Sequence, residues 1–282
     1  MSARPIANVP QHELSDGTTI PQLGFGVWQI PNEEASKATA EALRIGYRLI
    51  DTAAIYGNEA GVGEAIRDSG IDRSEIYLTT KVWNSSQGYD RTLRAFDKSL
   101  GRLGLDSVDL YLIHWAAPPL DLYVDTWKAL VSLREEGRVR SIGVSNFHQA
   151  HIRRIVEETG VTPVINQVEM HPYLQLDELR AFHREHGIAT EAWSPLGSGN
   201  GLLEDPALAD IASRVGASAA QVVLAWHLAV GNVVIPKSVT PSRIAENLAS
   251  VDEKLSADDL ASIAALDRGL RYGSDPDTAS FS

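Results

Sequence analysis

The chain has 282 residues, 44% of them apolar and 22% charged, which is the composition of a globular protein with material for a large core. Its formal net charge of −12 argues against nucleic acid and against an anionic membrane surface as main partners. Cysteine is absent, which excludes disulfides, thiol nucleophiles and Cys-ligated metals and fits a cytoplasmic location.

The N-terminal stretch MSARPIANVPQHEL contains no apolar signal-peptide core. No later run reaches the ~18 apolar residues that a membrane helix needs, so we expect a protein outside the membrane. The segment HELSDGTTI predicts a β-hairpin that turns at Asp16 and Gly17.

Short β-type runs then alternate with amphipathic helical patterns along the rest of the chain. The runs are 22–28, 48–53, 76–82, 109–115, 141–147, 164–170, 188–194 and 232–238. Such alternation implies a parallel α/β sheet with right-handed crossovers. Eight units predict a single (β/α)8 TIM-barrel domain over residues 1–282, with two additional helices before and after the eighth strand. A doubly wound open sheet is the alternative, and it fits this number of strands less well.

The expected strand ends carry polar or aromatic side chains. In chain order they are Trp28, Asp51, Lys81, His114, Ser145, Asn146, Gln167, Trp193, Ser194, Lys237 and Ser238. Because the active site of such a barrel lies at the carboxyl ends of its strands, these residues predict one shared polar cup.

Asp51, Tyr56, Lys81 and His114 suit proton transfer to an oxygen that gains negative charge. A Tyr phenol has an ordinary pKa of about 10, and a neighbouring Lys ammonium favours the phenolate and lowers that pKa. A carboxylate paired with the Lys would hold it in place, which makes Tyr56 a usable general acid. His114, as a neutral donor, could orient a carbonyl oxygen. Taken singly, each residue also fits a structural role.

The segment VVIPKSVTPSRIAENL predicts an anion site. Thr240 and Pro241 are typical of a helix N-cap and first helical position. Lys237 and Arg243 flank that helix start, and cations together with backbone N–H groups favour a phosphate. No G-x-G-x-x-G turn exists in the chain, so any dinucleotide would bind without a Rossmann fingerprint.

Other interpretations stay open from the residues alone. Lys81 could serve as a Schiff-base lysine in a barrel aldolase or isomerase. Glu169 and Glu191 could form a glycosidase pair, although we prefer buried, hydrogen-bonded roles for both. His183 and His186 are expected on an exposed helix face, and no His, Asp or Glu spacing indicates a metal site.

Five ordered segments resemble the aldo-keto reductase superfamily. They are GYRLIDTAAIYGNEAGVG, VRSIGVSNF, NQVEMHP, WSPLG and IPKSVTPSRIAEN, and they span most of the chain. The sequence is most similar to bacterial members of the 2,5-diketo-gluconate reductase and glyoxal reductase type. The resemblance implies a monomeric, NADPH-dependent carbonyl reductase that acts on aldehydes and ketones, including small α-dicarbonyls and keto sugars. Some members of the family regulate channels, so a redox-sensing module is a further possibility.

The resemblance also assigns roles to individual residues. It implies a catalytic tetrad of Asp51, Tyr56, Lys81 and His114, with Tyr56 as the proton donor. The cofactor-binding residues it implies are Ser145, Asn146, Gln167, Trp193, Ser194, Leu196, Lys237, Ser238, Arg243 and Asn247. The substrate-binding residues would be Trp28, Trp83, His114 and Trp115, with Trp115 the one whose role is most easily only packing. Trp193 stands where many members have Tyr, so ring stacking on the nicotinamide should persist while its tilt changes.

Overall fold

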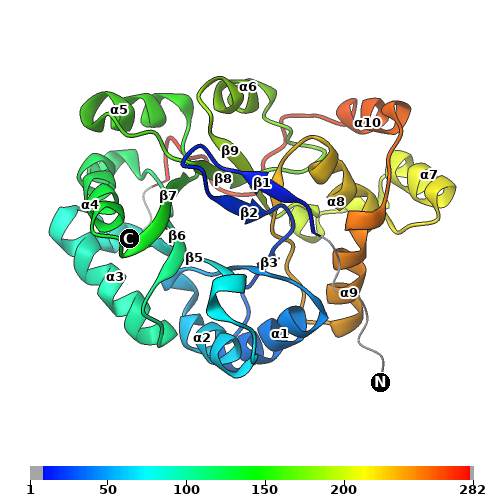
Figure 1. Ribbon diagram of the computed structural model, residues 1–282. Coiled ribbons are helices and arrows are strands. Elements are labelled where there is room, and N and C mark those ends of the chain that lie inside the picture. Colours follow the sequence, from blue (N-terminus) through cyan, green and yellow to red (C-terminus); the bar gives the residue numbers. More distant parts are fainter. Residues whose placement is uncertain (1–8, 280–282) are drawn as a thin grey trace.

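The computed structural model describes residues 9–279. Two antiparallel strands, β1 (Gln11–Glu13) and β2 (Thr19–Pro21), open this part of the chain and form the expected hairpin. Asp16 stabilises its turn, because Asp16 Oδ1 accepts from the Thr18 backbone N–H at 3.0 Å and Asp16 Oδ2 accepts from Ser141 Oγ at 2.7 Å. The hairpin lies across one end of the main sheet (Figure 1).

The main sheet contains eight strands in the spatial order β10-β9-β8-β7-β6-β5-β4-β3, and every neighbouring pair is parallel. The strands are β3 (Phe25–Gly26), β4 (Leu49–Asp51), β5 (Tyr77–Val82), β6 (Val108–Ile113), β7 (Val139–Ser145), β8 (Ile165–Glu169), β9 (Ala189–Trp193) and β10 (Val233–Val234). A bridge between Leu23 and Val234 joins the first and last strands, so the sheet closes. The predicted TIM barrel is confirmed.

The first and last strands are shorter than the predicted runs 22–28 and 232–238. Single hydrogen bonds continue their pairing instead, from Gly24 N to Val234 O at 2.8 Å and from Gly26 N to Pro236 O at 3.1 Å. The two backbones approach closely there: a Cβ added to Gly26 would lie 2.9 Å from the Ile235 carbonyl oxygen. Glycine at the seam therefore permits the closure.

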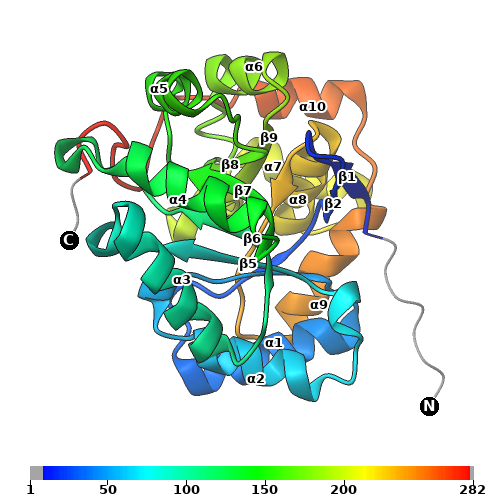
Figure 2. The same ribbon diagram turned by 60° about the vertical axis from the view of Figure 1, so that its left-hand side comes forward.

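A ring of helices surrounds the barrel (Figures 1 and 2). They are α1 (Asn32–Ile45), α2 (Glu59–Asp68), α3 (Tyr89–Leu103), α4 (Tyr123–Glu135), α5 (Gln149–Thr159), α6 (Asp177–Glu185), α7 (Pro206–Val215), α8 (Ala219–Ala229), α9 (Pro241–Ala249) and α10 (Ala257–Ala264). Two helices lie between β9 and β10 and two follow β10, which confirms the prediction of two additional helices. In the part of the chain described, no single helix is long and apolar enough to span a membrane. Only α7 and α8 taken together reach that length and hydropathy, and they are bent by 88° relative to each other.

Alternation along the strands divides the core into two layers. On β4, Leu49 belongs to the barrel interior, whereas Ile50 belongs to the layer between sheet and helices. The interior cluster comprises Leu14, Ile20, Leu49, Tyr77, Leu110, Leu112, Val164, Ile165, Ala189, Val233 and Ile235. Leu14 and Ile20 come from the hairpin, so an apolar plug closes that end, and the polar residues gather at the opposite ends of the strands.

Candidate active site

Three strands bring the predicted titratable residues together. Asp51 is the last residue of β4, Lys81 is the fifth of six residues in β5, and His114 directly follows β6. All three side chains are buried, and Lys81 is completely inaccessible to solvent. Since β4, β5 and β6 are neighbours in the sheet, these residues converge at one edge of the barrel mouth.

Lys81 and Asp51 form a buried ion pair. Lys81 Nζ donates to Asp51 Oδ1 at 2.6 Å and to the Thr52 carbonyl at 3.0 Å. Burial acts to lower the pKa of Lys81, but the charge of Asp51 and the neighbouring Tyr56 hold that pKa above its ordinary value. The ammonium is therefore charged at neutral pH, and removing either partner of such a pair costs about 3–5 kcal/mol of stability.

Tyr56 ends the short 3-10 helix η1 (Ala54–Tyr56), which follows β4. Lys81 Nζ lies 5.1 Å from the centroid of its ring, and the ring meets His114 edge-on with centroids 5.6 Å apart. Although the residue is only half-buried, its hydroxyl is enclosed, and burial raises the pKa of the Tyr56 phenol. Lys81 lowers that pKa as the sequence predicts, but burial outweighs it. The phenol consequently keeps its proton at neutral pH.

His114 is a neutral imidazole at this site. Burial, followed by the charge of Lys81, lowers its pKa well below the ordinary value. Its Nδ1 is buried and has no hydrogen-bond partner within residues 9–279. Trp83 packs edge-on against it with ring centroids 5.1 Å apart. A neutral imidazole offers one donor and one acceptor, so His114 can orient an uncharged polar group.

The residues expected around a nicotinamide form one hydrogen-bonded network. Ser145 Oγ donates to the Gln167 backbone carbonyl at 2.8 Å, and Asn146 Nδ2 donates to the His114 carbonyl at 3.0 Å. Trp193 Nε1 donates to Asn146 Oδ1 at 2.9 Å. Asn146 also has a left-handed backbone, with a φ of 56°. Non-glycine residues in that region concentrate at functional sites.

The loop after β9 carries Ser194 and Leu196. Ser194 has a left-handed backbone with a φ of 51°, and its hydroxyl accepts from Ser198 Oγ at 2.8 Å. Leu196 is partly buried against the core. The structure thus places both residues directly after Trp193, on the same side of the barrel as the buried ion pair.

The predicted anion site lies at the start of α9. Thr240 is the N-cap and Pro241 the first helical residue, as expected, and Ser238 Oγ accepts from the Thr240 backbone N–H at 3.1 Å. Lys237 and Arg243 are exposed, whereas Asn247 on the same helix is buried. Two accessible cations therefore flank a helix N-terminus, which is the arrangement that suits a phosphate.

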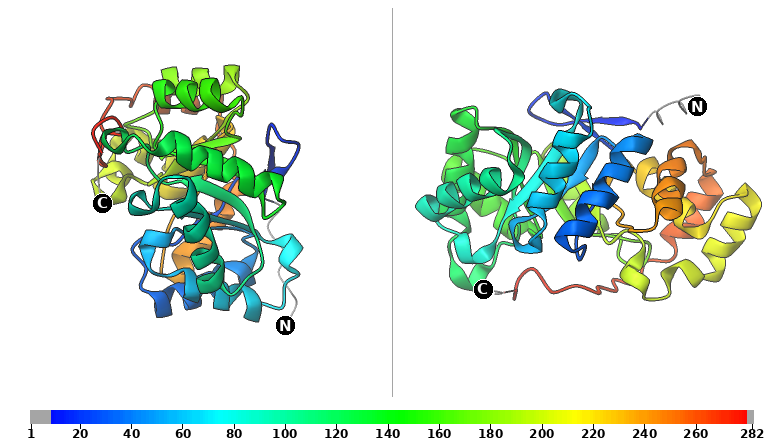
Figure 3. Two further views of the ribbon diagram at one scale, coloured as in Figure 1. Left: turned by 90° about the vertical axis from the view of Figure 1, so that its left-hand side faces the viewer. Right: turned by 90° about the horizontal axis from the view of Figure 1, so that it is seen from below.

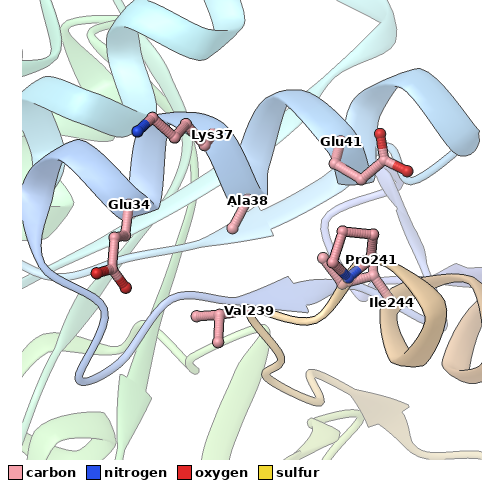
Figure 4. A pocket seen from close by; sticks show the side chains of 7 residues that line it. All are labelled: Glu34, Lys37, Ala38, Glu41, Val239, Pro241 and Ile244. Carbon is pink, nitrogen blue, oxygen red and sulfur yellow. The ribbon is translucent and has the colours of Figure 1, made fainter.

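A cavity of about 270 Å³ lies between α1 and α9 beside this helix start. Ala38, Val239, Pro241 and Ile244 form its apolar wall, and Figure 4 shows the side chains of Glu34, Lys37 and Glu41 extending in different directions around it. Its charged groups do not converge on one point, and it contains no tetrad residue.

The three predicted substrate tryptophans differ in exposure. Trp28 is 48% exposed, Trp83 is half-buried against His114, and Trp115 is 8% exposed. The rings of Trp28 and Trp83 are therefore accessible to a ligand. Trp115 is mainly a packing residue, whose carbonyl accepts from Gln87 Nε2 at 2.7 Å.

Glu169 and Glu191 are both fully buried and hydrogen-bonded, as preferred from the sequence. Glu169 anchors the C-terminal tail, because its two carboxylate oxygens accept from Tyr272 N at 2.6 Å and Gly273 N at 2.8 Å. This tail runs along the face of the barrel opposite the hairpin (Figure 3). A Cβ added to Gly273 would lie 2.6 Å from the Trp193 ring, so the tail packs directly on that ring.

The sequence-based prediction was wrong for His183. It is completely buried, with Nε2 3.1 Å from Asn166 Nδ2 and Nδ1 2.9 Å from Thr190 Oγ1, whereas His186 is exposed as expected. Burial lowers the pKa of His183 to about 3, so it serves as a neutral core residue. The spacing from Leu179, another buried residue four positions earlier on α6, could have indicated this.

Sequence spacing also could not reveal one group of possible metal ligands. His148 Nδ1 lies 2.7 Å from Asp277 Oδ1, and Asp275 lies close to both. Both carboxylates are exposed and come from the tail. The group contains none of the tetrad residues.

Comparisons with known proteins agree with this fold. Residues 22–268 match the profile of the aldo/keto reductase family. The chain is 50% identical to the methylglyoxal reductase DkgA of Escherichia coli K12, over 96% of this chain and 98% of that protein. It is 59% identical to an aldo/keto reductase from Brucella melitensis of known crystal structure, with a TM-score of 0.91, over 94% and 100% of the two chains. A mutant of Gox0644, crystallised in complex with NADPH, is 50% identical with a TM-score of 0.92, over 96% and 99%.

The closed parallel barrel places a Tyr phenol next to a buried Lys–Asp pair at the carboxyl ends of its strands, where the active sites of such barrels lie. Because the family profile matches residues 22–268 and these relatives are at least 50% identical, the chain belongs to the aldo/keto reductase family.

Proposed function

We propose that this protein reduces small aldehydes and ketones to alcohols, with Tyr56 as the proton donor. Family membership makes the chain an NADPH-dependent oxidoreductase. The observation that supports Tyr56 as the proton donor is the buried Lys81–Asp51 pair, whose ammonium lies 5.1 Å from the centroid of the Tyr56 ring. An ammonium held at that position stabilises the phenolate that remains after proton donation.

The residues of the barrel mouth fit NADPH. The exposed Lys237 and Arg243 at the start of α9 offer charge to a 2′-phosphate, and Trp193 offers a flat ring at the mouth. Nδ1 of His114 is a buried polar atom that has no hydrogen-bond partner within residues 9–279, so no contact among these residues compensates for its burial. NADPH, when bound, supplies the hydride that reduces the carbonyl carbon.

The residues of this chain supply the proton and the orientation. His114, which is neutral, orients the carbonyl oxygen through a hydrogen bond. The Tyr56 O–H bond then breaks, and its proton passes to the oxygen as negative charge develops there. Lys81 stabilises the resulting phenolate, and Asp51 holds Lys81 in place through the 2.6 Å ion pair.

Small α-dicarbonyls and keto sugars are the substrates that we infer. The similar protein from Escherichia coli is named a methylglyoxal reductase. Trp83 is half-buried beside His114 and Trp28 is exposed, and we infer that the two rings form an accessible aromatic wall above the tetrad. A compact carbonyl compound fits such a wall, which is apolar around a few placed polar groups.

The Tyr56→Phe variant tests this function, because it removes only the hydroxyl. We expect the reduction of methylglyoxal or of a keto-sugar acid to fall by about 10²–10⁴-fold, while the Kd for NADPH stays within about twofold. The matched control is Tyr89→Phe, which removes an exposed hydroxyl that contacts Ser132 on the outer helices, and it should keep wild-type rates.

Two results would count against the assignment. Reduction that survives in Tyr56→Phe would remove Tyr56 as the donor. A wild-type protein that binds NADPH tightly but reduces no compound in a broad carbonyl panel would favour the redox-sensing alternative.

The Schiff-base alternative is weakened by the state of Lys81. A nucleophilic amine must be neutral, whereas the Lys81 ammonium donates to Asp51 and to the Thr52 carbonyl and has a raised pKa. Trapping of substrate on Lys81 by borohydride would nevertheless revive it. The cytoplasmic location, the monomeric state and the single domain over residues 1–282 stay predictions.

A further inference from the structure

Glu191 lies beneath the tetrad and belongs to none of the roles above. It is in the middle of β9, its side chain is completely buried, and its register partner on β8 is Gln167. Its surroundings are charged on several sides. Asp51 on β4 and Lys81 on β5 both act on its carboxyl electrostatically, and Glu191 in turn acts on Tyr56 and Tyr77.

One amide nitrogen links Glu191 to the tetrad. Gln167 Nε2 donates to Glu191 Oε2 at 2.9 Å and to Asp51 Oδ2 at 2.9 Å. A glutamine NH2 group has two protons, so these two bonds use its donors completely. The side-chain carbonyl oxygen of Gln167 is the remaining polar atom of the amide, and it takes part in neither of these bonds.

We propose that Glu191 is a positioning residue for the nicotinamide half of the cofactor, acting through Gln167. With Asp51, it fixes the Gln167 amide so that its NH2 group faces inward and its carbonyl oxygen faces the cofactor. That oxygen can accept from the amino group of the nicotinamide carboxamide. The inference rests on the proposed function, because it requires a bound nicotinamide.

An apolar residue at position 191 would remove this constraint. Asp51 alone would then hold one N–H of Gln167, and the second would be left unpaired in a buried site. The amide could turn and present an N–H to the carboxamide amino group, where two donors face each other. Such a mismatch weakens binding, because a buried donor without an acceptor loses its full hydration free energy.

The protonation of Glu191 is compatible with this role. Burial, followed by the charge of Asp51, raises the pKa of Glu191 to about 8, so the carboxyl is largely protonated at neutral pH. A protonated carboxyl retains a carbonyl oxygen that can accept from Gln167. Its other oxygen, Oε1, has no partner in the part of the chain described and can hold the proton.

Two ligands distinguish a specific effect on nicotinamide binding from a general loss of structure in the variant. NADPH contains the nicotinamide, whereas adenosine 2′,5′-bisphosphate contains only the adenosine and 2′-phosphate half. We expect Glu191→Leu to weaken NADPH about tenfold, the effect of one lost hydrogen bond to a buried group, and to leave the Kd of the bisphosphate within about twofold. Glu191→Gln, which can turn its own carbonyl toward Gln167 Nε2, should bind NADPH within about twofold of wild type.

Gln167→Ala completes a double-mutant cycle. If Glu191 acts through Gln167, Glu191→Leu should cause no further loss of NADPH affinity in the Gln167→Ala background. Glu59→Gln is the matched control, since it alters a buried carboxylate outside the barrel interior that pairs with Arg102. This variant should change neither the Kd of NADPH nor the Kd of adenosine 2′,5′-bisphosphate.

Each result has a defined consequence. Wild-type affinity for NADPH in Glu191→Leu overturns the inference. An equal loss of affinity for NADPH and for the bisphosphate does so too, as does a further loss of NADPH affinity when Glu191→Leu is added to Gln167→Ala. If Glu191→Leu does not fold, the smaller Glu191→Ala variant is measured in the same way. Failure of the wild-type protein itself to bind NADPH overturns the proposed function and this inference together. If the wild-type protein binds NADPH and reduces carbonyl compounds, but Glu191→Leu has the same NADPH affinity, only this inference is overturned.

Discussion

Replacement of Glu191 by glutamine should change how the stability of this protein depends on pH. The carboxyl has a pKa of about 8 in the folded protein, because of burial and then the charge of Asp51, against an ordinary value of 4.5 in an unfolded chain. Between these pH values the folded protein therefore holds one proton more than the unfolded chain. Its stabilising contribution is complete below pH 4.5 and is lost as the pH rises through 8.

The magnitude follows from the difference between the two pKa values. One proton bound only in the folded state corresponds to about 1.4 kcal/mol of unfolding free energy per pH unit. The amide that replaces the carboxyl in Glu191→Gln does not titrate. The unfolding free energy of this variant should therefore rise relative to wild type by about 1.4 kcal/mol for each unit between about pH 5 and pH 8.

Urea unfolding of wild type and Glu191→Gln at about pH 5, 6, 7 and 8 measures this difference directly. The comparison uses the slope against pH, so a constant cost of the substitution cancels. Glu185→Gln, at the exposed end of α6, is the matched control and should retain the wild-type slope. A stability difference between wild type and Glu191→Gln that stays constant over this pH range would mean that Glu191 is ionised in the fold, and the reasoning about its burial would be wrong.

Two further substitutions test other parts of the structure. Lys237→Ala combined with Arg243→Ala removes both exposed cations at the start of α9, so NADPH should weaken at least about tenfold more than NADH in fluorescence titration; equal weakening would refute the 2′-phosphate assignment. Gly63→Ala should destabilise the fold by about 1–3 kcal/mol in urea unfolding, because its Cβ would lie 1.9 Å from the Leu103 carbonyl oxygen and force α2 away from α3. Gly101→Ala on α3, which meets nothing within 4 Å, should be neutral or stabilising, and an equal loss there would contradict the packing argument.

Much of the fold was predictable because it rests on local patterns. The hairpin turn at Asp16 and Gly17 and the alternation of strands with helices need only short-range sequence signals. The barrel then places strand ends together, which is why Asp51 and Lys81 could be expected as neighbours from their positions alone. The exact ends of β3 and β10 could not be predicted, since they depend on how closely the two backbones approach at the seam.

The interior of the site was less predictable because it depends on distances across the barrel. Gln167 and Asp51 are 116 positions apart, and their contact exists only because the sheet closes. The direction of the Tyr56 pKa shift also depends on contacts between residues that are distant in the sequence. The sequence indicated the effect of Lys81, but the larger effect of burial depends on everything packed around the phenol. His183 shows the opposite case, because its helical spacing from Leu179 carried the information.

The barrel has an apolar end and a polar end, and this difference has a consequence for engineering. Leu14 and Ile20 of the hairpin close one end of the barrel with apolar side chains, whereas the hydrogen-bonded groups occupy its other end. Substitutions at positions that share no partner usually have additive effects. Residues of the hairpin end could therefore be varied for thermal tolerance, and those around the Lys81–Asp51 pair, where we propose catalysis, for substrate preference, in separate libraries whose best members are combined afterwards.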